Sequence, residues 1–135
     1  MANYYGAGRT NYFKVHNIAK FEKELAKYGL DGQVMKASVG RQKLVAIIPD
    51  NYDDGFPWQY LDDNDDYQDI PWNEVFKAHL ADDWVAIIVE VGNEKLRYLN
   101  GCAIGYNNKG ESVEISINDE KPFKVLGKNV TGASH

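Results

Sequence analysis

Carboxylates dominate the middle of the chain. Residues 50–90 hold twelve acidic side chains and one base, Lys77, so this stretch has a net charge of -11 in a protein whose total is -5. Closely spaced carboxylates can bind a hard cation, act as acid and base in hydrolysis, or present negative charge to a partner. The rest of the chain is correspondingly basic, so the protein is polarised.

The acidic run that begins at Asp62 does not match a helix–loop–helix calcium site. A loop starting at Asp62 places Tyr67 where a glycine is needed, and one starting at Asp63 places Gln68 there. No spacing selects two of the carboxylates as an acid and base pair. The sequence therefore predicts no metal site, although loose cation affinity and a simple solvated loop both stay open.

The sequence gives little support for a catalytic nucleophile or for a phosphate-binding loop. Cys102 is the only cysteine, which excludes an intramolecular disulfide, and nothing in its local sequence activates it toward a pairing with His79. The glycine-rich segment 6–10 lacks the lysine of a phosphate loop. We expect no catalytic residue, no cofactor and no enzymatic activity.

Large aromatic rings are interleaved with the aspartates of the acidic stretch. In protein interfaces aromatic side chains act as anchors and charges steer association, so this mixture favours docking on a basic surface. Equally, the pattern fits rings that form core beneath an acidic rim. The candidate partner-binding residues are Asp53, Asp54, Trp58, Tyr60, Asp62, Asp63, Asp65, Asp66, Tyr67, Asp69, Trp72, Asp82 and Asp83.

The predicted partner is a protein with a basic, nucleic-acid-binding surface. Alternate carboxylates on an extended chain lie about 6.6 Å apart, near the phosphate repeat of a nucleic acid strand, so they can compete for a basic groove. The same charge repels phosphates, so no direct nucleic-acid binding is expected.

Two other classes of function stay open. One is a small enzyme or ligand-binding module with a pocket between the sheet and loop 50–70, lined by Trp58, Tyr60, His79 and Cys102. The other is an assembly protein, because exposed aromatic residues also drive self-association, and a homodimer is compatible with this sequence.

The chain length of 135 residues, 44% of them hydrophobic, predicts one domain over 1–135 with a flexible arm at 1–9 and a tail at 127–135. The apolar runs are too short to cross a membrane, and no secretory signal is visible, so we expect a cytoplasmic protein without membrane contact.

Periodicity and turn residues predict an α+β fold with the order β-α-β-β-α-β-β-β. We expect an antiparallel or mixed sheet of about six strands with two helices on one face, which combines a ferredoxin-like start with a C-terminal meander. The predicted elements are strand Thr10–His16, helix Ile18–Tyr28 capped by Asn17, strands Val34–Ser38 and Lys43–Ile48, loop Asp50–Ile70, helix Trp72–Ala81, strands Trp84–Val91, Leu96–Tyr106 and Ser112–Ile117, and a short edge strand Pro122–Leu126.

Several segments resemble a pattern in small proteins encoded by phages and other mobile elements. The resemblance lies in Glu90–Gly101 with the following Asn107, Gly110 and Glu111, in Thr10–Val15, and in Pro57-Trp58. It implies a setting in the host cytoplasm, where small acidic proteins inhibit defence systems such as CRISPR and restriction nucleases, and no functional residue comes with it. The leading hypothesis is a phage-type inhibitor that docks its acidic–aromatic surface on such a nuclease.

Overall fold

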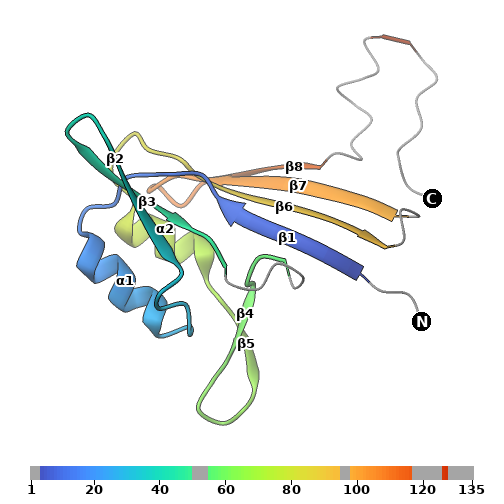
Figure 1. Ribbon diagram of the computed structural model, residues 1–135, viewed down its shortest axis with the longest axis horizontal. Helices are drawn as coiled ribbons and strands as arrows, with labels where there is room; N and C mark the ends of the chain where they lie inside the picture. The colour runs from blue at the N-terminus through green and yellow to red at the C-terminus, as the bar shows by residue number, and fades with distance from the viewer. Residues whose placement is uncertain (1–3, 50–54, 95–97, 117–125, 128–135) are drawn as a thin grey trace.

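The protein has an α+β fold of two helices and eight strands within the residues that the computed structural model describes, 4–49, 55–94, 98–116 and 126–127 (Figure 1). The elements in chain order are β1 (Tyr4–Thr10), α1 (Ile18–Ala26), β2 (Val34–Val39), β3 (Gln42–Ile47), β4 (Gln59–Leu61), β5 (Tyr67–Asp69), α2 (Trp72–His79), β6 (Ala86–Glu94), β7 (Tyr98–Tyr106) and β8 (Ser112–Ser116).

A four-stranded antiparallel sheet in the order β1-β6-β7-β8 is the largest unit of the described chain. The prediction that the apolar strand beginning near Trp84 is central is confirmed, because β6 pairs with β1 on one side and β7 on the other. The strand extends through Glu94, so the turn expected at Asn93 and Glu94 is wrong. The long β6–β7 ladder supplies backbone partners beyond the apolar run.

The first strand lies earlier than predicted. Residues Tyr4–Thr10, expected to belong mostly to a flexible arm, form β1 and pair residue for residue with β6 from Thr10↔Ile88 to Tyr4↔Glu94. The segment is rich in glycine and alanine and lacks the alternation that marks a strand, so only this long-range ladder defines it. In place of the predicted strand Thr10–His16, Phe13 and Val15 make isolated bridges.

The predicted helix and hairpin that follow are confirmed. Asn17 caps α1, with its side-chain oxygen accepting the Lys20 N–H at 3.0 Å, and Gly29 with φ 75° lies just past the helix end. Strands β2 and β3 pair as a hairpin whose turn contains Gly40 at φ 62°. They form a sheet of their own in the described chain, so the strands divide over three sheets and the ferredoxin-like start is not formed.

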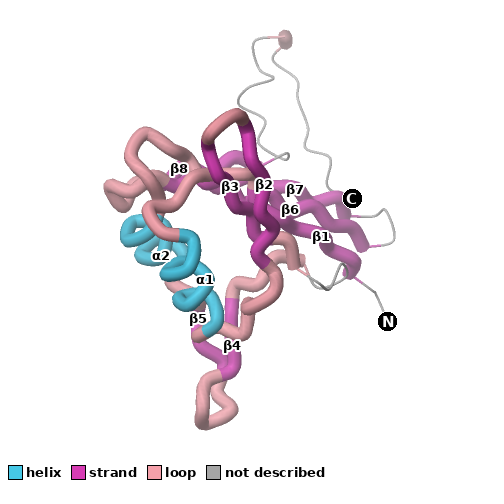
Figure 2. Tube along the Cα trace, turned by 60° about the vertical axis from the view of Figure 1, so that its left-hand side comes forward, coloured by secondary structure: helices cyan, strands magenta, loops and turns pink. Residues whose placement is uncertain are grey.

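The segment predicted as a long loop, Asp50–Ile70, contains a third small sheet. Its β4 and β5 pair antiparallel from Gln59↔Asp69 to Leu61↔Tyr67, and this hairpin projects away from the body of the protein (Figures 1 and 2). The short strands carry too few side chains for a detectable period of two. The predicted strand Pro122–Leu126 and tail 127–135 fall almost entirely outside the described residues.

A chain of aromatic rings forms the centre of the core. The Phe13 ring meets Phe21 and Phe76 edge-on, with centroids 5.8 and 5.5 Å apart, and Trp72 stacks on Phe76 at 5.6 Å. These rings connect the helices to the four-stranded sheet through Phe76, which contacts Tyr106 of β7. Both helices lie on the same side of that sheet (Figure 2). The expected placement of two helices on one face is therefore confirmed.

Successive residues of β6 face opposite sides of the sheet. Ala86 and Ile88 are fully buried against the core, whereas Val89 and Val91 on the other face are 42% and 52% exposed. Among the described residues the central strand is thus covered on one face only, although its composition is that of a strand buried on both.

Neighbouring substitutions in β6 test this assignment. Ile88→Ala opens a cavity in the core and should lower the free energy of unfolding by about 3 kcal/mol, whereas Val89→Ala should cost less than about 1 kcal/mol. Urea denaturation followed by tryptophan fluorescence measures both. Equal costs would contradict the assignment of the two faces.

Candidate partner-binding surface

The acidic hairpin, defined here as residues 59–69, is organised by one of its own carboxylates. Asp62 accepts hydrogen bonds from the backbone N–H of Asn64 at 2.9 Å and of Asp66 at 3.0 Å, and from the Gln68 side chain at 3.1 Å. The backbone bond from Asp66 is the main cause that lowers the pKa of Asp62. Asp62, predicted to contact a partner, therefore shapes the tip, where Asp65 adopts φ 62°.

The remaining aspartates of the hairpin face solvent. Asp63, Asp65, Asp66 and Asp69 are all exposed, and the hairpin contains no lysine or arginine. Asp69, at the base of the hairpin, accepts a hydrogen bond from the Gln59 side chain at 3.2 Å, whereas Asp63, Asp65 and Asp66 gather at the tip. Exposed carboxylates at the end of a projecting element give a concentrated negative potential.

An apolar pair crosses the acidic hairpin next to its tip. Leu61 and Tyr67 are direct cross-strand partners, and they are 54% and 70% exposed. Exposed large apolar side chains surrounded by charges resemble the anchor and rim of a protein interface. Among the predicted aromatic anchors Trp58, Tyr60, Tyr67 and Trp72, Tyr67 is thus the exposed one.

The other predicted rings hold the hairpin to the body. Trp72 is buried in the core and donates its indole N–H to the Pro57 carbonyl at 3.0 Å, so its predicted role as a partner anchor is wrong. Trp58 and Tyr60 are half-buried, and Tyr60 packs edge-on against Tyr28, in the turn that follows α1, with ring centroids 4.9 Å apart. These rings form core beneath the acidic surface, the alternative that the sequence left open.

Glu90 fastens the base of the hairpin to the sheet, a role that the sequence did not reveal. Its carboxylate accepts the Phe56 backbone N–H at 2.7 Å and the Trp58 indole N–H at 3.1 Å. Gly55, at φ 75°, is required beside it, because a Cβ there would lie 2.8 Å from the Glu90 carboxylate. The available signal was a lone acid inside the most apolar strand.

One further pair of predicted aspartates lies apart from the hairpin. Asp82 and Asp83 belong to the turn between α2 and β6, where Asp82 accepts a hydrogen bond from Asn108 and Asp83 adopts φ 65°. Asp53 and Asp54 are outside the described residues. The acidic surface that the structure defines is therefore smaller than the predicted one.

The residues proposed to line an enzyme pocket are used for packing. Phe56 fills the junction of loop and sheet so closely that a Cβ on Gly8 would lie 2.8 Å from the Phe56 Cβ. Burial raises the pKa of the Cys102 thiol, and the nearby Glu90 and Glu114 raise it further. A thiol kept protonated in this way is a poor nucleophile.

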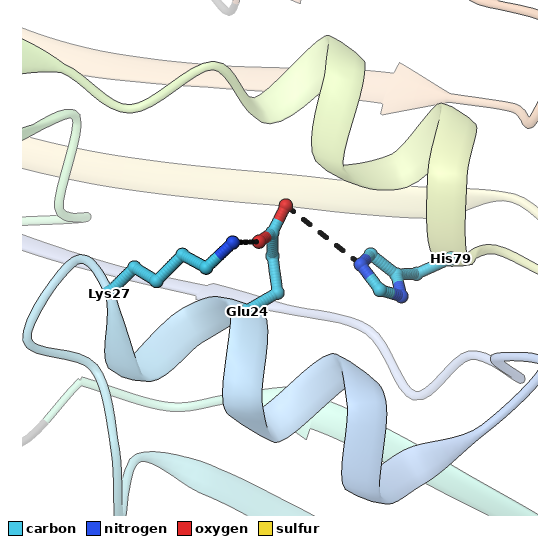
Figure 3. Close-up of polar contacts among 3 residues, drawn as sticks. All are labelled: Glu24, Lys27 and His79. Atoms are coloured by element: carbon cyan, nitrogen blue, oxygen red, sulfur yellow. Dashed lines mark ion pairs between the residues drawn. The ribbon is translucent and has the colours of Figure 1, made fainter.

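His79 lies at the contact between the two helices (Figure 3). Its Nε2 is 3.9 Å from Glu24 Oε1, while Glu24 Oε2 forms an ion pair with Lys27 Nζ at 3.0 Å. Burial lowers the pKa of His79, and Glu24 partly opposes that shift. The Phe21 ring packs against the imidazole, so this histidine belongs to the helix interface.

The described residues contain no group of three or more side chains placed to hold a metal ion. In the same part of the chain, no helix has the length and apolar character needed to span a bilayer. Comparison of the sequence and fold with family models, curated proteins and solved structures gives no match, so the functional inference depends on geometry.

Removal of the Glu90 carboxylate should release the base of the hairpin. Glu90→Ala leaves the Phe56 and Trp58 donors without an acceptor and should lower the free energy of unfolding by about 2 kcal/mol. Glu114→Ala, an exposed acid on the same side of the sheet, is the matched control and should stay within about 0.5 kcal/mol. Urea titrations measure both, and similar effects would contradict a fastening role for Glu90.

Acidification should destabilise the fold through His79. Its folded pKa is lowered, so just below the ordinary histidine value the unfolded chain binds a proton that the folded chain does not. Stability present at about pH 7.5 is therefore lost progressively toward about pH 5.5. Thermal melts should show a smaller loss for His79→Gln than for wild type. An unchanged loss in His79→Gln would disprove this linkage.

Proposed function

We propose that this protein is a non-enzymatic binding protein that docks its acidic hairpin on a basic, nucleic-acid-binding surface of another protein. The observation that carries the proposal is an ordered, projecting hairpin whose exposed carboxylates surround an exposed Leu61–Tyr67 pair. Such an element combines the charge needed for steering with an apolar anchor.

Charge density supports a basic partner. Residues 59–69 hold five aspartates and no base. An approaching basic groove would meet a potential comparable in sign and spacing to that of a nucleic acid strand, so the hairpin would compete for the groove rather than extend it. This is the behaviour of an inhibitor of a nucleic-acid-binding protein.

Preorganisation supports tight binding by so short an element. The tip is closed by the Asp62 hydrogen bonds, and at the base the Ile70 N–H donates to the Trp58 carbonyl at 2.8 Å. A segment that is already ordered loses little conformational entropy on docking. The sequence resemblance to proteins of mobile elements favours a host-defence nuclease, of the CRISPR or restriction kind, as the partner in the host cytoplasm.

Neutralising the exposed aspartates should weaken binding in graded steps. We expect the triple variant Asp63→Asn/Asp65→Asn/Asp66→Asn to associate about tenfold more slowly than wild type at low salt, with a smaller difference at high salt. Tyr67→Ala should instead raise the dissociation rate, because it removes an anchor. Asp62 is left intact because it shapes the tip.

The measurement begins with affinity capture from a host lysate, with wild type and the triple variant as matched baits. Surface-immobilised kinetics with the captured partner then use Asp31→Asn/Glu74→Gln/Glu114→Gln as the control of equal charge change, since all three residues are exposed. Added duplex DNA or RNA should displace the protein from its partner, and the isolated protein should bind neither. Loss of binding at a single carboxylate, or no competition by nucleic acid, would contradict the proposal.

A further inference from the structure

The four-stranded sheet has an apolar side that faces away from the core. This open face is defined by the side chains of Ile87, Val89 and Val91 on β6, Ala103 on β7, Val113 and Ile115 on β8, and Arg9 at the β1 edge, which the registers place on one side. Val113 and Ile115 are 68% and 60% exposed. Contiguous apolar surface of this kind marks an interaction site in soluble proteins.

In β8 the apolar residues lie on the open face and the polar residues on the core side. Its polar residues Ser112 and Glu114 share the side of Tyr106 and Ile104, toward the core, while Val113 and Ile115 point outward. A strand with one solvated face normally shows the reverse arrangement, because the apolar residues face the core. The sequence thus supplies β8 with side chains suited to a second, separate layer.

The open face also has hollows beside its ridges. Gly105 has no left-handed φ, and a Cβ added there would make only an ordinary contact of 3.6 Å with Val85, so nothing inside the chain requires glycine. Its missing side chain contributes to a hollow of about 230 Å³ lined by Val85 and Val113. A second hollow of about 220 Å³ lies beside Ala7, on the other side of the β6 ridge, and is lined by Val89 and Val91.

We propose that the open face is the interface of a homodimer, in which two copies of this chain pack sheet against sheet. One surface offers both the valine and isoleucine ridges and the hollows over small residues, and this self-complementarity is what a two-fold interface requires. Facing sheets pack about 10 Å apart through interdigitated side chains of this size.

The charge distribution permits a second copy at this face. Each chain carries a net charge of -5, so two copies repel except where acidic residues are remote. Arg9, the cross-strand partner of Val89, is the charged side chain that the register places on this face at its β1 edge, and Glu111 lines the hollow beside Val113. The acidic hairpin emerges from the opposite side of the sheet, where Trp58 is bonded to Glu90, so docking keeps the two hairpins apart.

The available area reaches the threshold for a specific interface. Four strands at about 4.8 Å spacing and six or so residues at about 3.4 Å each give a face of roughly 20 Å by 20 Å. Covering it on both copies removes on the order of 1,000 Å² of accessible surface, near the lower bound for a specific interface. An apolar face of this area suits a dimer that dissociates in dilute solution.

Sedimentation velocity of the full chain over a range of concentrations tests the proposal. Wild type should be dimeric at about 100 µM and dissociate on dilution. Val113→Glu buries two charges across the two-fold axis and should raise the dissociation constant by about 100-fold. Gly105→Val fills the hollow, and its Cβ meets Val85 at an ordinary contact distance, so it should weaken the dimer at least about tenfold. The melting temperature of the monomer, measured alongside, separates this effect from a loss of folding.

The control is Val39→Glu on β2, where the valine is 64% exposed but lies outside the open face. It should leave the dissociation constant unchanged, as should the triple aspartate variant of the hairpin, so failure of this proposal is separate from failure of the proposed function. A wild type that stays monomeric at the highest concentration overturns the homodimer. A dimer that tolerates both Val113→Glu and Gly105→Val overturns the assignment of its interface.

Discussion

The hydrogen bonds to the Glu90 carboxylate set the position of the aromatic core and of the acidic hairpin relative to the four-stranded sheet. They hold residues 55–58 on one side of the four-stranded sheet, where Phe56 enters the chain of aromatic rings and Trp58 leads directly into the acidic hairpin. The backbone comes this close only because Gly55 and Gly8 have no side chain. A carboxylate inside an apolar strand is costly unless its oxygens are hydrogen-bonded, and two donors from the loop meet that need.

The acidic residues therefore fall into two groups: carboxylates that accept hydrogen bonds within the fold, and carboxylates that face solvent. Glu90 and Asp62 accept hydrogen bonds from backbone or indole N–H groups of the same chain. Asp63, Asp65 and Asp66 are exposed to solvent. Composition alone treats all of these residues as one block of negative charge. The structure divides the block, so a screen that neutralises all acids together would confuse loss of folding with loss of docking.

Cap and turn residues in the sequence correctly predicted those elements that are defined by residues close together in the chain. The Asn17 cap with Gly29 defines α1, and the turn at Gly40 defines the β2–β3 hairpin. Strand β1 escaped prediction because its glycine-rich segment gains its order from β6, about 80 residues away in the chain. The acidic hairpin was not predicted because its strands lack an alternating apolar pattern. Its tip is instead held by hydrogen bonds from backbone N–H groups to the Asp62 carboxylate. Whether a ring was core or anchor could not be read from the sequence, because both uses require the same residue types.

The apolar residues on both faces of β6 are explained if both faces are buried, one in the core of the chain and the other in the proposed dimer. Its own chain covers Ala86 and Ile88, and the proposed dimer would cover Val89 and Val91, so each copy contributes one of the two layers that such a strand requires. The two acidic hairpins would then stand on the outer sides of the pair, because each leaves the sheet on its covered face. Two sites displayed from one rigid body increase apparent affinity only for partners whose basic surfaces recur at a matching separation. Dimerisation would in this way select among basic proteins that a single hairpin, which recognises charge and one apolar pair, could not distinguish.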